Sequence, residues 1–204
     1  MIQTTAAALA KQWARNGIIH AEDTEAYQYG LELMLSTLLN IAVMFGLSLA
    51  IGHAWLLVPY LAAFIPLRLS AGGYHAKHHV SCILFNAGIY FAGLSAVIML
   101  PAQTAAILCI MESSLSLVMI VLFAPVPAKN KPLSARERKR NRRLSLGLGF
   151  MLLVLCVLFY HSNVLAFTGC RMVFCGQAAA TILLILEKAS SALTKKQKKE
   201  DSCM

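Results

Sequence analysis

The amino-acid sequence predicts an all-α integral membrane protein with about six transmembrane helices and an N-terminal amphipathic interfacial helix. Hydrophobic residues make up 58% of the 204 residues, mean hydropathy is +0.66, and only 13% of residues are charged. Soluble domains use about 25% charged residues, so this chain has too few charges for a water-facing surface. The low charge also excludes a disordered chain. The six cysteines show no paired spacing, which excludes a small disulfide-rich secreted domain.

Stretches without Lys, Arg, Asp or Glu define the predicted spans. They cover residues 33–67, 78–111, 113–128, 144–170 and 172–186. A bilayer core about 30 Å thick requires roughly 20 helical residues. The first stretch is therefore divided at Gly52-His53 and the second at residues 101–104. The predicted helices are 31–51, 54–68, 83–100, 104–124, 144–160 and 166–187.

The two terminal segments are predicted to be cytoplasmic, whereas the turns at residues 52–53, 101–103 and 161–165, which contain no Lys or Arg, are predicted to lie on the outer side. In residues 1–30, Leu9, Trp13 and Ile18 are spaced at helical intervals, which favours an amphipathic helix that lies on the cytoplasmic leaflet and ends at Gly17. Residues 31–187 form the predicted membrane domain. Residues 188–204 form a basic tail, whose last part, 195–204, is predicted to be disordered.

The distribution of Lys and Arg predicts the orientation. Eight of the 18 basic residues lie between Lys129 and Arg143, and five lie in residues 188–199. Because cytoplasmic loops carry the Lys and Arg excess, we expect both termini, the loop 68–82 and the basic loop 125–143 at the cytoplasmic face of the cell membrane. Anionic lipid headgroups account for the positive charge. Membrane lipids are therefore expected partners and nucleic acid is not.

The loop at residues 68–82 concentrates the reactive side chains. His75, His78, His79 and Cys82 lie within eight residues of one another. Histidine transfers protons near neutral pH, and a neighbouring imidazolium favours the thiolate form that makes cysteine a nucleophile. The pattern predicts covalent acyl transfer at a boundary between membrane and cytoplasm.

The residues alone leave the partner of Cys82 open. On a continuous helix, His78 would neighbour Cys82 at the i, i+4 spacing, whereas His75 would lie about 10 Å away along the axis. His75 can serve only if the chain bends. His75 and His79, with Cys82, also have ligand types that suit zinc or copper, but no acidic residue lies nearby, so no metal or other cofactor is expected. The alternative to an enzyme is a non-enzymatic multi-pass transporter or metal-handling membrane protein that uses this His-rich loop.

The loop resembles the accessory gene regulator B (AgrB) family of bacterial membrane endopeptidases, and the resemblance covers most of the chain. It rests on three blocks: Arg68-x-x-Ala71-Gly72-Gly73-x-His75-Ala76 with Cys82 seven residues after His75, residues 124–133 (APVPAKNKPL), and residues 29–32 (YGLE). The resemblance implies a membrane cysteine endopeptidase that removes the C-terminal part of a quorum-sensing propeptide and supports its cyclisation. The implied substrate is a short amphipathic peptide, and a homodimer is also implied.

The resemblance further implies roles for individual residues. Cys82 is expected to be the nucleophile and His75 the general base, so that a thioester acyl-enzyme forms. This choice of His75 requires that residues 75–82 are not a simple exposed helix. Roles for His78, His79 and Arg171 stay open. From the residues themselves, and not from the resemblance, substrate binding or oxyanion support is expected from Arg68, Gly72, Gly73, Ser81 and Glu32. Glu32 is expected either to pair with Arg68 across the first hairpin or to cap the helix start.

Overall fold

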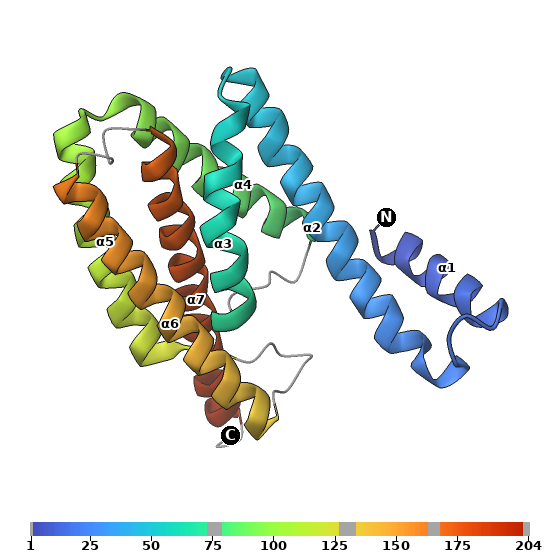
Figure 1. The fold of residues 1–204 in the computed structure, drawn as a ribbon. Helices are drawn as coiled ribbons and strands as arrows, with labels where there is room; N and C mark the ends of the chain where they lie inside the picture. The colour runs from blue at the N-terminus through green and yellow to red at the C-terminus, as the bar shows by residue number, and fades with distance from the viewer. Residues whose placement is uncertain (1, 73–78, 127–133, 163–167, 202–204) are drawn as a thin grey trace.

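The computed structural model describes residues 2–72, 79–126, 134–162 and 168–201 (Figure 1). These residues contain α-helices, two short 3-10 helices and no strand. Six of the helical segments are long and apolar enough to cross a membrane, which confirms the predicted fold class. The α-helices are α1 (Ile2–Arg15), α2 (Thr24–Ala50), α3 (Leu57–Ala71), α4 (His79–Met99), α5 (Ala102–Phe123), α6 (Ala135–His161) and α7 (Thr168–Asp201), with η1 (Ala21–Asp23) before α2 and η2 (Ala54–Leu56) before α3.

Helix α7 forms the centre of the bundle. It contacts α3, α4, α5 and α6, and Figure 1 shows it in red beside α3. The core around it is apolar and includes Tyr60, Tyr90 and Leu184, each almost fully buried. The rings of Tyr60 and Tyr90 meet edge to face with centroids 4.8 Å apart, a favourable geometry for aromatic pairs.

The outer surface of the bundle is also apolar. Large hydrophobic side chains are exposed on every span, including Leu38, Val58, Met99, Leu122 and Phe150. In water such a surface would be an aggregation hazard, whereas in a bilayer it meets acyl chains of the same polarity. The chain is therefore a multi-pass membrane protein.

Hydrogen bonds between helices form inside this apolar bundle. The hydroxyls of Ser48 on α2 and Tyr90 on α4 bond to each other. Between α5 and α7, Ser113 Oγ donates to Gln177 Oε1 at 3.0 Å, and Thr181 Oγ1 donates to Ser116 Oγ at 2.9 Å. In hydrocarbon such groups have no water to bond to, so paired Ser, Thr and Gln side chains hold neighbouring helices together.

The N-terminal helix forms as the sequence predicts. Gly17, at φ +70°, ends α1 as expected, and Ile18 N–H bonds back to Trp13 C=O, an arrangement typical of glycine-terminated helices. The apolar face of α1 packs on α2 through Ala6, Ala10 and Leu31, away from the other helices (Figure 1). Protein covers this face, and its placement on the leaflet stays a prediction.

Three predicted helix ends are wrong, because the helices continue beyond their apolar parts. Helix α2 begins at Thr24 in place of 31. Helix α6 begins at Ala135 in place of 144, where Ser134 and Glu137 form a capping box that satisfies the first free N–H groups. Helix α7 continues to Asp201, so residues 195–201 are helical and not disordered. Within the described residues of the two predicted loops, 68–71, 79–82 and 135–143 are helical.

The close contact between α3 and α7 allows a test of the fold. A Cβ built on Gly176 would lie 2.3 Å from the backbone oxygen of Tyr60, so Gly176→Ala must push the two helices apart. Overpacking of this kind costs about 1–3 kcal/mol, and we expect a lower thermal unfolding midpoint in detergent micelles. Gly147→Ala is the matched control, because a Cβ there meets nothing within 4 Å. Equal midpoints for the two variants would contradict the contact.

Candidate active site

Cys82 lies in the first turn of α4, at the end of the bundle where α3 ends and α6 begins. Its side chain is half-buried. The first N–H groups of a helix have no partner within the helix, and they place partial positive charge at its N-terminus. The Cys82 sulfur therefore lies beside the N-terminal N–H groups of α4.

Arg68 interacts electrostatically with groups on both α4 and the central helix α7. It lies in the last turn of α3 and is half-buried. Both Cys82 and Glu187 lie within electrostatic reach of its guanidinium. Arg68 thus adds a positive charge near the candidate nucleophile, and Glu187 of α7 supplies an opposite charge to Arg68. The sequence did not single out Glu187, because only the packing of α7 brings this residue near Arg68.

Gly72 ends α3 in a conformation that other residues rarely adopt, at φ +79°. Immediately before it, Ala71 C=O accepts a 3.0 Å hydrogen bond from Val126 N–H. A Cβ on Gly72 would lie 2.2 Å from Val126 O, so only glycine allows the connection after α5 to lie this close. The contact therefore fixes the point where the chain leaves α3 for the segment that carries His75.

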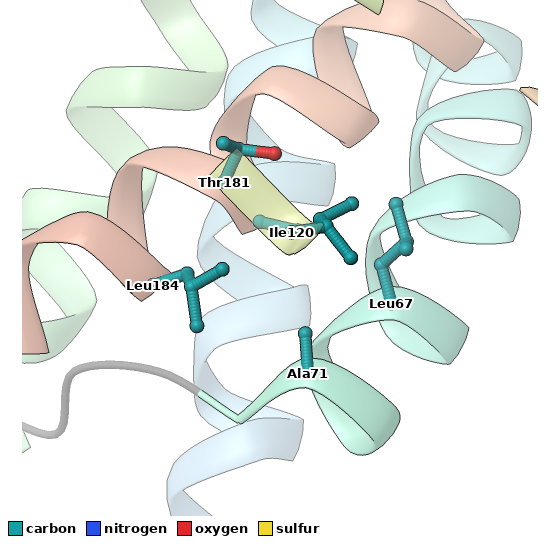
Figure 2. A pocket seen from close by; sticks show the side chains of 6 residues that line it. Leu67, Ala71, Ile120, Thr181 and Leu184 are labelled. Carbon is teal, nitrogen blue, oxygen red and sulfur yellow. The ribbon is translucent and has the colours of Figure 1, made fainter. Parts of the chain in front are cut away.

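The region between α3, α5 and α7 near the end of α3 is apolar and closely packed. Figure 2 shows a pocket between α3, α5 and α7 that is too small for a water molecule, and Leu67, Ala71 and Leu184 line it with Ile120 and Thr181. Leu67, Ile120 and Leu184 are each at most 1% exposed. The helices are therefore closely packed next to the end of α3 that carries Arg68.

Asn86 lies one turn after Cys82 on α4, and its Nδ2 donates a 3.5 Å hydrogen bond to Cys82 Sγ. It is only 5% exposed. The sequence analysis did not single out Asn86, although a polar amide four residues after Cys82 is unusual in an apolar stretch that spans the membrane. At that spacing two helical side chains are neighbours.

The remaining predicted site residues are partly outside the described chain. His75, His78 and Gly73 lie there. His79 is the first residue of α4, and Ser81 lies exposed in its first turn. Glu32 lies on α2 and accepts a 3.0 Å hydrogen bond from Gln28. Its expected pairing with Arg68 stays a prediction.

Two ionisable residues in the spans lie in another part of the bundle. Glu112 and Arg171 line a cavity of about 140 Å³ together with apolar residues of α4, α5 and α7. Glu112 accepts a hydrogen bond from Ser116, and Arg171 Nη1 donates to Leu100 C=O at 3.4 Å. Leu100 and Arg171 are at the end of the bundle opposite Cys82, so Arg171 is not part of the candidate site.

Comparison with known proteins identifies the family. The model of the accessory gene regulator B family matches residues 2–185. This chain belongs to the AgrB family. The searches of curated proteins and of solved structures returned no match. AgrB membership confirms the resemblance and assigns the chain to the processing of quorum-sensing propeptides.

Proposed function

We propose that this AgrB protein is a membrane cysteine endopeptidase that cuts a quorum-sensing propeptide through a thioester at Cys82. The observation that carries the proposal is the setting of Cys82, in the first turn of a helix and within electrostatic reach of Arg68. Positive surroundings of this kind activate cysteine nucleophiles. Family membership supplies the process in which such a nucleophile would act.

In the proposed reaction, His75 takes the proton of the Cys82 thiol as the sulfur attacks the scissile carbonyl carbon. The C–N bond then breaks, and His75 returns the proton to the leaving amine, which departs with the C-terminal part of the propeptide. The N-terminal part remains on Cys82 as a thioester. A cysteine thiol of the bound peptide next attacks that thioester, its proton passes to the Cys82 sulfur, and a thiolactone ring closes.

The surrounding residues support these steps in different ways. The Arg68 guanidinium is placed to stabilise negative charge, either on the thiolate or on the tetrahedral oxygen. Ser81 and the backbone N–H groups at the start of α4 are further donors at the same end of the helix. Attack by the substrate thiol in place of water requires that water be kept from the thioester.

The basic residues support a cytoplasmic position for this site. The exposed arginines at the start of α6, such as Arg138 and Arg142, and Lys188 of α7 lie at the Cys82 end of their helices. By the positive-inside rule this end faces the cytoplasm. Both termini then lie in the cytoplasm, anionic lipids meet the basic residues, and the short amphipathic propeptide reaches Cys82 from that side. A homodimer is part of the proposal by family resemblance.

A trapped intermediate tests the proposed function. The purified protein is incubated with a candidate propeptide, a short amphipathic peptide with an internal cysteine, in which that ring-forming cysteine is replaced by Ala. Ring closure is then blocked, and we expect the N-terminal fragment to accumulate on the protein as a thioester. Mass spectrometry should locate the fragment on Cys82, and hydroxylamine should remove it. Cleavage without any adduct, or an adduct on another residue, would exclude the mechanism.

A further inference from the structure

We propose that Asn86 is a second group that acts on the nucleophile: its side-chain amide donates to the Cys82 sulfur and stabilises the thiolate. The inference rests on the proposed function and adds a residue to its site. The hydrogen bond from Asn86 Nδ2 to Cys82 Sγ is 3.5 Å long. Asn86 gives up no proton. The thiol proton leaves to the general base, and the amide bonds the sulfur before and after that transfer.

The surroundings of Asn86 show why its bond to sulfur is unusual. The side chain is 5% exposed and shares its part of α4 with the buried residues Ile83, Ala87 and Tyr90. Burial of an amide in apolar surroundings is unfavourable unless it is hydrogen-bonded. A neutral thiol is a weak acceptor, so it offsets this cost poorly. A thiolate is a stronger acceptor, because hydrogen bonds to charged groups are about twice as strong as neutral ones.

Three serines in the spans bond differently. Ser48, Ser70 and Ser114 each donate to the backbone carbonyl of the residue four positions earlier, the usual solution for a hydroxyl inside a helix. Asn86 has the same spacing to Cys82, but its amide reaches the side-chain sulfur. Its hydrogen bond is therefore made to the reactive atom and not to the helix backbone.

Arg68 is a second positive group near this sulfur. Its guanidinium lies within electrostatic reach of Cys82 from α3, while Asn86 donates from α4 itself. The sulfur thus has a cation nearby and a donor in direct contact. Arg68 acts over a distance and the Asn86 amide acts by contact, so removal of the amide should weaken thiolate formation without removing it.

Alkylation of Cys82 tests the role of Asn86 separately from peptide cleavage. The full-length protein in detergent micelles is treated with iodoacetamide, and mass spectrometry follows modification of the peptide that contains Cys82. Asn86→Ala and Asn86→Leu both remove the donor, and Leu keeps the side-chain volume. We expect alkylation at pH 7 to be about tenfold slower in both variants. At an alkaline pH that ionises the thiol in every variant, the rates should be equal.

The comparison of the two pH values separates chemistry from structure. A merely structural role would change access to Cys82 and alter the rate equally at both pH values, which would overturn the proposal, as would an unchanged rate at pH 7. Asn40→Ala is the matched control, because Asn40 is an amide in another span, on α2. Its rates should equal those of the unmodified sequence.

Cleavage assays then distinguish this inference from the proposed function. If Cys82 is the nucleophile, Asn86→Leu should lower kcat/KM about tenfold at neutral pH. If Cys82→Ala still cleaves the propeptide, the proposed function fails, while the alkylation result continues to report on Asn86 alone.

Discussion

Cys82→Ala is expected to lower cleavage of the propeptide by at least about 10³-fold, because the proposed thioester forms on the Cys82 sulfur. Cleavage is followed by mass spectrometry after co-expression with the propeptide. Cys170→Ala is the matched control: Cys170 is also half-buried but lies at the start of α7, at the other end of the bundle. Full cleavage by Cys82→Ala would exclude the endopeptidase mechanism.

The same assay identifies the general base. His75→Ala should lower cleavage by about 10²–10⁴-fold, the usual contribution of a positioned base, and His78→Ala should cleave at nearly the normal rate. The reverse result would mean that the base is the histidine four residues before Cys82. The helical spacing, and not the family pattern, would then identify the pair.

Gly72→Ala is expected to lower kcat for cleavage by roughly 10²-fold, since a displacement of about 1 Å in a catalytic group has an effect of that size. The added Cβ would meet Val126 O at 2.2 Å, so the end of α3 or the connection after α5 must move. Either movement changes the path of the chain toward His75. The amount of protein in the membrane should remain close to normal, as measured by immunoblot.

Gly52→Ala separates this contact from backbone strain. Gly52 has the same φ of +79°, but a Cβ there meets nothing within 4 Å. Both variants therefore strain the backbone, and only Gly72→Ala pushes against Val126. If the two variants cleave equally well, the contact with Val126 has no part in placing the catalytic segment.

The spans could be predicted from the sequence, but several helix ends could not. Apolar stretches of about 20 residues indicate where a chain crosses the bilayer, and charged residues end such a stretch without ending the helix. Residues 135–143 are rich in Arg and Lys, which are good helix formers, so α6 begins before the membrane does. Ser134 and Glu137 signalled this start through the capping-box spacing, which the hydropathy pattern does not register.

The candidate site was predictable where its residues are close in sequence. Cys82 and Arg68 belong to one short motif, and Asn86 follows Cys82 at a helical spacing that could have been noticed. Glu187 could not have been found in this way, because its position near Arg68 depends on how α7 packs against α3. Long-range contacts of this kind follow from the packing of the whole bundle and from no local pattern.

The two hydrogen bonds between α5 and α7 have a consequence for the distant active site. Ser113–Gln177 and Ser116–Thr181 lie on successive turns and together fix the rotation of α7 about its long axis. A slip by one residue would turn the helix by about 100° and leave both pairs broken in hydrocarbon. It would also carry the carboxylate of Glu187 away from Arg68. The two polar pairs inside the membrane thus set the rotation of α7, and with it the direction in which Glu187 lies relative to Arg68.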